Sequence, residues 1–132
     1  MAARFTELVL DCHDHDLLGN FWQQVLGYEV TERSDGPDDY YVELTGPTGA
    51  GPTLLVSRGP DEKVGKNRLH LDLNATDRDQ DAEVERILAL GATRADIGQG
   101  PDVSWVVLAD PEGNEFCVLR SRVDAHPAER RA

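Results

Sequence analysis

Polar and apolar residues alternate along ELVLDC, the stretch from Glu7 to Cys12. Side chains of an extended chain point to opposite faces at successive positions, so Leu8, Leu10 and Cys12 share one face. Val9 lies on the other face, between two acidic residues. This period of two predicts a strand with one face buried against a core.

The spacing of apolar residues becomes helical in the next stretch. Residues three or four positions apart form one apolar stripe, which consists of Leu18, Phe21, Trp22 and Val25. Asp14 precedes the stripe as an N-cap, and Gly27 follows it at a position where glycine most easily adopts the left-handed C-cap conformation. We therefore expect a helix that begins after Asp14 and buries Trp22 in the core.

Three short runs with strand character follow the helix. They cover residues 28–33, 40–44 and 53–57, and turns rich in glycine, proline and aspartate separate them. The first half of the chain therefore reads βαβββ.

The second half of the chain repeats this order. ELVLDCHD from Glu7 aligns with HLDLNATD from His70, 63 positions later, and YVELTGPTG from Tyr41 aligns with WVVLADPEG from Trp105, 64 positions later. Self-similarity at a fixed period indicates two copies of one supersecondary unit. The sequence thus predicts a second βαβββ module.

The elements of the second module follow from the same patterns. We expect a strand with Leu69, Leu71 and Leu73 on its apolar side, then a helix capped by Asp77 and ending near Gly91. The apolar stripe of that helix is Val84, Ile87 and Leu88. Three strands complete the module, at residues 93–97, 105–109 and 115–119.

These modules predict an α+β fold in which two tandem βαβββ units form one domain over residues 1–121. The modules span about 4–58 and 67–121, a polar linker joins them, and residues 122–132 form a flexible tail. A helix covers only one face of each sheet, so the other faces are expected to curve around a common cleft. The residues predicted on these faces are Glu7, Val9, Asp11, His70, Asp72, Asn74, Glu115, Cys117 and Leu119.

Charge and composition narrow the classes of partner. The 132-residue chain has a formal net charge of −12, and a surface this acidic repels phosphate backbones, so we expect no nucleic acid. No apolar run is long enough to span a bilayer and no secretory signal is evident. We therefore expect a cytoplasmic protein that does not associate with a membrane. In a reducing compartment Cys12 and Cys117 are expected to be free thiols.

Several ordered segments resemble one known family. LGYEV and LGATR follow the two helices, NRLHLDL opens the second module and DPEGNEFCVL closes it. Together with FW in the first helix, these segments resemble the glyoxalase-like branch of the glyoxalase / bleomycin resistance / extradiol dioxygenase superfamily, which has the vicinal oxygen chelate fold. The resemblance covers residues 4–121.

The resemblance implies where a metal would be held. Metal-dependent members place four ligands on the first and last strands of the two modules, and these positions correspond to Glu7, His70, Cys117 and about Leu54. Leu54 cannot ligate a metal, and its neighbour Leu55 is no better. Glu7, His70 and Cys117 would form an incomplete set that suits zinc. We therefore expect no metal and no other cofactor, with zinc, nickel, manganese or iron as the alternative, and Cys117 as a small buried residue of the pocket wall.

Other residues are candidates for acid–base catalysis or ligand stacking, and a structural role is the alternative for the histidine. His70 faces the same side as Asp72 and is expected to approach Glu7, as an acid–base pair or as a structural hydrogen bond. Trp105 and Tyr41, paired by the repeat, are candidates to stack on a flat ligand.

Two polar segments have the composition of a helix cap and of a turn, rather than of a functional site. His13 and His15 flank the cap residue Asp14, and we expect both to be exposed rather than metal ligands. DPEGN, which begins at Asp110, has the composition of a turn and no catalytic role.

Three functional hypotheses follow. The first is a glyoxalase-like protein that holds a small organic molecule, with Asp72, Trp105, Tyr41, Cys117 and Leu54 in its pocket. The second is a metal-dependent lyase, isomerase or dioxygenase of the same superfamily, in which Glu7 and His70 are ligands or catalytic groups. The third is a metabolite-sensing or interaction domain. The resemblance also implies a homodimer.

Overall fold

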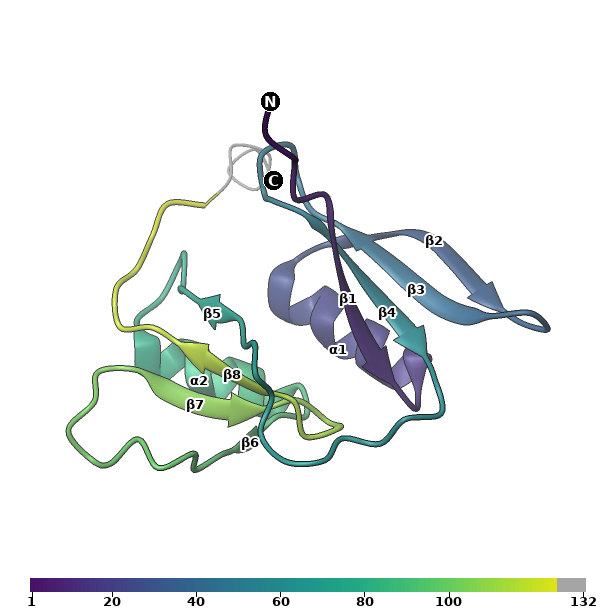
Figure 1. Cartoon of the computed structure of the whole chain (residues 1–132). Helices are drawn as coiled ribbons and strands as arrows, with labels where there is room; N and C mark the ends of the chain where they lie inside the picture. Colours follow the sequence, from purple (N-terminus) through teal and green to yellow (C-terminus); the bar gives the residue numbers. More distant parts are fainter. Residues whose placement is uncertain (126–132) are drawn as a thin grey trace. The chain divides into compact units, whose positions relative to one another are not determined.

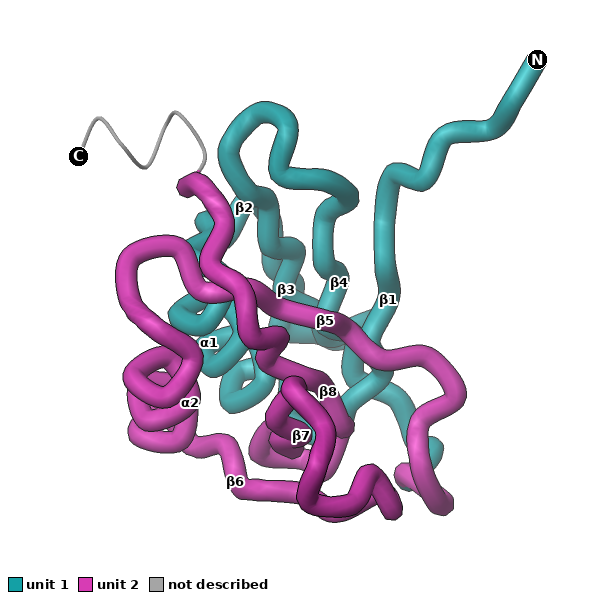
Figure 2. The backbone as a smooth tube through the Cα atoms, turned by 90° about the vertical axis from the view of Figure 1, so that its left-hand side faces the viewer, with its two compact units in different colours: residues 1–62, 126–132 teal, residues 63–125 magenta. Residues whose placement is uncertain are grey.

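Figure 1 shows the computed structural model of the chain, in which residues 1–125 are described. These residues divide into two units, Met1–Glu62 and Lys63–Ala125 (Figure 2). Each unit contains one four-stranded sheet and one helix of eight or more residues. The prediction of an α+β chain with two βαβββ modules is therefore confirmed.

The first unit has strands β1 (Glu7–Cys12), β2 (Glu29–Asp35), β3 (Tyr40–Thr45) and β4 (Thr53–Arg58). Their order in the sheet is β1-β4-β3-β2. The first strand pairs in parallel with the last one, and the other neighbours are antiparallel. β1 and β2 are consequently the edges of the sheet.

Helix α1 (His15–Leu26) follows the predicted signals. Asp14 is the N-cap, and its carboxylate accepts a hydrogen bond from the Leu17 amide at 3.1 Å. Gly27 ends the helix with φ 67°, which is the left-handed conformation that glycine adopts without a steric penalty. The whole predicted stripe is buried, including Trp22.

One face of the first sheet packs against α1 (Figure 1). At Gly19 an added Cβ would lie 3.0–3.2 Å from three side-chain atoms of Val42, so the helix approaches β3 closely. Leu44, Leu54 and Val56 are buried on this face with Val42. Residues between them in the strands point to the opposite face, which no helix of the unit covers.

The second unit repeats the topology with shorter strands. It contains β5 (Asp72–Leu73), α2 (Gln80–Ala89), β6 (Thr93–Arg94), β7 (Val106–Ala109) and β8 (Glu115–Val118). The order is β5-β8-β7-β6, and β5 is parallel to β8. The predicted strand positions were right, but several ends were not.

The strand predicted around Leu69, Leu71 and Leu73 is shorter than expected. Regular pairing covers only Asp72–Leu73, with a further hydrogen bond from the Cys117 amide to the Leu71 carbonyl at 2.9 Å. Leu69 precedes this pairing and is 81% exposed. Its expected place on a buried face was therefore wrong, because β8 does not extend far enough to pair with it.

Asp79, not Asp77, caps the second helix. The Asp79 carboxylate accepts a hydrogen bond from the Ala82 amide at 2.8 Å. Asp77 instead pairs with Arg78. The sequence DRDQD offers aspartates two positions apart, and the helix begins after the second of them. Val84 and Ile87 are buried as predicted.

The run 93–97 ends as a strand after Arg94 because side chains take over the backbone hydrogen bonds. The Gly98 amide donates to the Asp96 carboxylate, and the Ile97 amide donates to the Gln99 side chain, both at 2.8 Å. Such local bonds compete with a strand ladder.

Hydrogen bonds tie the end of the described chain to the second unit, and the Asn74 side chain donates one of them to the Ser121 carbonyl at 2.7 Å. The Val123 amide donates to the Ala75 carbonyl at 3.0 Å. Most of the predicted flexible tail, residues 126–132, lies outside the described residues. Within residues 1–125, no helix has the length and apolar character needed to cross a membrane.

Candidate functional site

The uncovered face of the second sheet brings together part of the predicted site. Asp72 and Cys117 are direct partners in the parallel ladder between β5 and β8, so their side chains share a face. Val107 of β7 is the partner of Cys117 on its other side. Phe116 and Val118 alternate with Cys117 and are buried on the opposite face.

His70, Asp72 and Cys117 form the polar centre of this face, which we call the His-Asp-Cys cluster. One potential ligand atom from each lies within 4.8 Å of the other two. The His70 Nε2 is 3.2 Å from the Asp72 Oδ1. The imidazole and the carboxylate are exposed, whereas Cys117 is only 4% exposed. The cluster thus has a solvent-exposed side, formed by His70 and Asp72, and a buried sulfur atom.

The surroundings of the Cys117 thiol favour its protonated form. Burial raises the pKa of this thiol, and the charge of Asp72 and its hydrogen bond with the thiol raise the pKa further. The thiolate is the nucleophilic and metal-binding form, so a raised pKa lowers the reactivity of the thiol in the absence of a cation. The raised pKa does not favour the thiolate that a catalytic nucleophile requires, and a place for Cys117 in a pocket wall stays a prediction.

The same donor set has the chemistry of a zinc site. Imidazole nitrogen, carboxylate oxygen and thiolate sulfur are the three donor types that zinc accepts, and a three-residue site leaves a position open for water or substrate. Binding would require loss of the thiol proton, which a dication beside Asp72 would favour. The residues therefore fit zinc, although Asp72 rather than Glu7 supplies the carboxylate within this unit.

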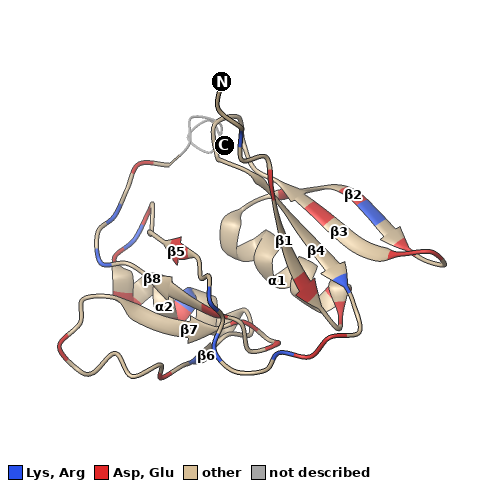
Figure 3. Cartoon of the chain, in the orientation of Figure 1, with Lys and Arg blue, Asp and Glu red and all other residues tan. Residues whose placement is uncertain are grey.

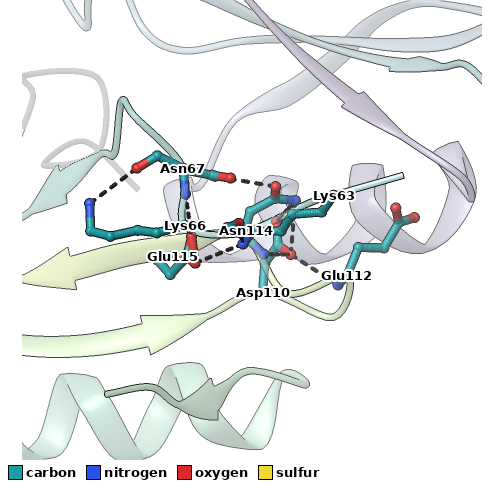
Figure 4. Close-up of polar contacts among 8 residues, drawn as sticks. Lys63, Lys66, Asn67, Asp110, Glu112, Asn114 and Glu115 are labelled. Carbon is teal, nitrogen blue, oxygen red and sulfur yellow. Dashed lines mark hydrogen bonds and ion pairs between the residues drawn. The ribbon is translucent and has the colours of Figure 1, made fainter. Parts of the chain in front are cut away.

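A buried turn fixes the start of β8. Asp110 is 2% exposed, and one of its carboxylate oxygens accepts hydrogen bonds from the amides of Glu112 and Asn114 at 2.9 and 3.0 Å (Figure 4). Gly113 has φ 89° at the tightest point of the turn. The prediction that this segment is turn chemistry agrees with this geometry, and the turn sets the position of Cys117.

Glu115 lies next to the turn and is neutralised there. Its carboxylate pairs with Lys63 at 2.8 Å and accepts a hydrogen bond from the Asn67 amide at 3.1 Å (Figure 4). Burial raises the pKa of Glu115, but the bonds from Lys63 and Asn67 outweigh burial and bring the pKa below its ordinary value. The linker residue Lys63 is thereby fixed on the second sheet.

The uncovered face of the first sheet contains other predicted residues. Glu7 pairs with Thr53 and is exposed at the start of β1. Val9, two positions later, is 51% exposed and pairs with Leu55. The Tyr41 hydroxyl donates to the Glu32 carboxylate on the same face.

Leu54 does not share this face. It is 4% exposed and lies with Leu44 on the side that packs against α1. Leu55 is the β4 residue on the uncovered face, because neighbouring residues of a strand alternate. The position that the resemblance implies for a ligand, about Leu54, therefore faces α1, and its neighbour Leu55 faces the uncovered side.

The other predicted residues are distributed as follows. Glu7 and His70 belong to different units, and the charged neighbour of His70 within its own unit is Asp72. Trp105 stands one residue before β7 and is 39% exposed. An acid–base pair of Glu7 and His70 stays a prediction.

Sequence reasoning missed the role of His15. It was expected to be exposed, but it is 6% exposed and its Nε2 lies 2.8 Å from the Asp35 carboxylate. Arg33 bonds the same carboxylate at 2.8 and 3.0 Å and also pairs with Asp16. His15 begins α1, so its ring turns back toward the end of β2. The signal in the sequence would have been an acidic strand end able to pair with it.

His15, Asp16 and Asp35 form the second group of potential metal ligands in residues 1–125. The guanidinium of Arg33 already neutralises both carboxylates of this group, so it reads as a structural cluster. His13 is exposed, as predicted.

Comparison with known proteins identifies the family. A model of the glyoxalase-like domain matches residues 7–119. A glyoxalase/bleomycin resistance protein/dioxygenase family enzyme from Burkholderia phytofirmans is 21% identical, with a TM-score of 0.69 over 88% of this chain and 97% of that chain. No curated protein matches the chain.

Fosfomycin resistance proteins share the same fold. FosX from Mesorhizobium loti is 14% identical, with a TM-score of 0.69 over 98% of both chains. FosX from Listeria monocytogenes, in a complex with Mn(II) and sulfate, is 18% identical, with a TM-score of 0.69 over 100% of both chains. The family match over residues 7–119 includes every strand and helix of the described chain. This chain therefore belongs to the glyoxalase-like domain family of the vicinal oxygen chelate superfamily.

Proposed function

We propose that this glyoxalase-like protein binds a small organic molecule on the uncovered faces of its sheets without a resident metal. The observation that supports this lies on β4: Leu54 is buried on the α1 side and Leu55 faces the uncovered side, so this strand offers no metal-ligating side chain at the position that the resemblance implies. A thiol and an imidazole next to one carboxylate supply hydrogen bonds on a partly apolar wall, as small-molecule sites require.

Binding is tested by NMR on the ¹⁵N-labelled full chain in the presence of EDTA. The probes are a fragment set of aromatic and aliphatic alcohols, amines and acids. We expect at least one fragment to cause saturable shifts at amides of β1, β4 or β8. The proposal fails if no fragment saturates, or if all saturable shifts lie on α1 and α2.

The second candidate is a metal-dependent lyase, isomerase or dioxygenase. The observation that favours it is the convergence of His70, Asp72 and Cys117 donors within 4.8 Å. Such a metal would act as a Lewis acid on a bound oxygen. The residues would hold the ion, and the open fourth position would face the exposed side of His70 and Asp72.

Cobalt(II) distinguishes the two candidates because a cobalt–thiolate bond absorbs in the near ultraviolet. The metal-free proposal predicts no such band when apo-protein is titrated with cobalt. A stoichiometric band that Cys117→Ser abolishes and Cys12→Ser retains would establish the metal site instead. Cys12 is the matched control, because it is also a buried cysteine outside any disulfide but lies in the first unit.

We also propose that the protein is located in the cytoplasm and forms a homodimer. Apolar side chains exposed in the described chain, such as Phe5 at 68% and Leu69 at 81%, support self-association. Light scattering coupled to size-exclusion chromatography should give twice the chain mass of 14.6 kDa. A monomeric mass at the concentrations used for NMR would reject this part of the proposal.

A further inference from the structure

The first sheet separates its charges between its two faces. On the face that packs against α1, Arg33 pairs with Asp16 and Asp35, and the Arg58 guanidinium lies 4.4 Å from the centre of the Tyr40 ring. These are the only basic residues of β1–β4. The positive charges of the strands are therefore engaged on the helix side.

The acidic residues of the strands, apart from Asp35, lie on the other face, which we call the acidic face. Pairing across the sheet places Glu7 beside Thr53, Glu29 beside Thr45 and Glu32 beside Glu43. The carboxylates of the acidic face are Glu7, Asp11, Glu29, Glu32 and Glu43. Figure 3 shows acidic residues on β1 and β3 and the basic residue on β2. No strand residue offers a compensating cation there.

The pKa of Tyr41 reflects the negative electrostatic potential of the acidic face. A hydrogen bond with Glu32, burial and the negative charges of Glu32, Asp39 and Glu43 together raise the pKa of Tyr41 to about 12. Each carboxylate opposes a second negative charge on the phenol. A positive charge at the same place would be stabilised by the same groups.

The centre of the acidic face is apolar. Val9 is 51% exposed and pairs with Leu55, which in turn pairs with Glu43. Hydroxyl groups of Thr53 and Ser57 lie on the same strand to either side of Leu55. An apolar patch with carboxylates beside it on β1 and β3 matches a molecule with a hydrocarbon body and a positive group.

Two other occupants fit this face less well. Among the described residues, no three acidic, histidine or cysteine donors of this face lie close enough together to hold a metal ion. A second copy of the chain, paired face to face about a twofold axis, would bring identical carboxylates together, and like charges in an interface are strongly unfavourable.

We infer that the acidic face recognises an organic cation, a molecule with an ammonium or guanidinium group on an apolar body. This inference rests on the proposed small-molecule binding and names the chemical class of the ligand.

The test uses three probes of similar size and different charge: benzyltrimethylammonium, benzyl alcohol and benzoate. Each is titrated into the ¹⁵N-labelled full chain at low ionic strength, and shifts are followed at amides of β1, β3 and β4. We expect the cation to bind about tenfold or more tightly than the alcohol, no saturation with benzoate, and weaker cation binding as salt is added.

A matched pair of variants locates the effect. Glu43→Gln removes a charge from the centre of the acidic face, and we expect about fivefold weaker cation binding. Glu62→Gln makes the same change at an exposed residue outside the strands and should leave the affinity within about twofold, because screening weakens distant charges.

The outcomes separate this inference from the proposed function. Equal affinity for the alcohol and the cation, or equal losses in both variants, would overturn the inference and leave small-molecule binding intact. Absence of binding by all three probes and by the whole fragment set would overturn both. Cation shifts confined to β5–β8 would also reject the acidic face as the site.

Discussion

The imidazole of His15 and the carboxylate of Asp35 are hydrogen bonded at 2.8 Å and join the first turn of α1 to the end of β2. Arg33 holds the other side of the same carboxylate. The helix and the hairpin of the first unit are thereby connected by a charged network at the margin of the core.

Asp35→Asn should lower the thermal midpoint at pH 7. Hydrogen bonds from Arg33, and then from His15, hold the pKa of Asp35 well below its ordinary value of about 4. The carboxylate therefore favours the folded state above that ordinary value, and this contribution is lost as pH falls through the lower, folded-state pKa. The difference from wild type, measured by calorimetry, should be constant near neutrality and shrink in acid. The exposed Asp38→Asn is the control, and an equal shift in both variants would contradict the prediction.

Gly19→Ala should destabilise the first unit although alanine is the better helix former. The new methyl group would meet Val42 at 3.0–3.2 Å, and Val42 is a buried core residue. We expect a loss of about 1–3 kcal/mol in the free energy of unfolding. Denaturant unfolding measures it, and Val42→Ala in the same chain should recover part of it.

Asn20→Ala provides the matched control for Gly19→Ala. Asn20 is exposed one position along the same helix, so alanine there should be neutral or stabilising by a few tenths of a kcal/mol. A stabilised Gly19→Ala variant would show that α1 and β3 are further apart than described.

Asp110→Ala should be among the most destabilising changes in the second unit. The buried carboxylate accepts bonds from the amides of Glu112 and Asn114 and from the Asn114 side chain. Removing it leaves partly buried donors without this acceptor, at a cost of about 1–3 kcal/mol. Hydrogen exchange at the Glu112 and Asn114 amides should accelerate.

Two comparisons check the role of Asp110. Asp110→Asn retains one acceptor oxygen and should lose less stability than the alanine variant. Asp102→Ala removes an exposed acid from a loop and should have little effect. Equal stability of Asp102→Ala and Asp110→Ala would contradict the described turn.

Cys117 should react slowly with iodoacetamide in the folded protein at pH 8. Burial and Asp72 both raise the pKa of the thiol and so reduce the thiolate fraction. Asp72→Asn removes the second cause and should accelerate labelling severalfold, as measured by mass spectrometry in a Cys12→Ser background. Rapid, stoichiometric labelling of Cys117 beside an intact Asp72 would disprove the protonated thiol.

Local patterns were sufficient to predict most of the fold. The period of two in β1, the stripe of α1 and the caps Asp14 and Gly27 each depend on residues close in sequence. The repeat then predicted the second unit. Errors arose where pairing partners decide the outcome: Leu69 is exposed because β8 does not reach it, and Asp77 loses the cap to Asp79.

The candidate site was harder to predict than the fold. Placing Asp72 beside Cys117 requires the register of a parallel pair separated by a helix and two strands, and the repeat supplied only an approximate register. The resemblance implied a position near Leu54 only approximately, and a shift of one residue decides whether a side chain faces α1 or the uncovered side. His15 was misread because its partner Asp35 lies in a different element, and no local pattern identifies such a pair.

The parallel pairing of β1 with β4 and of β5 with β8 has a consequence for synthesis on the ribosome. In each unit, the strand that is synthesised first can pair only after the last strand of that unit has been made. Until then β1 has no strand to pair with, and its backbone hydrogen-bonding groups stay without a ladder in a nascent chain that stalls before β4. Because residues 1–62 are contiguous, however, the first half can close its sheet before translation of the second half is complete.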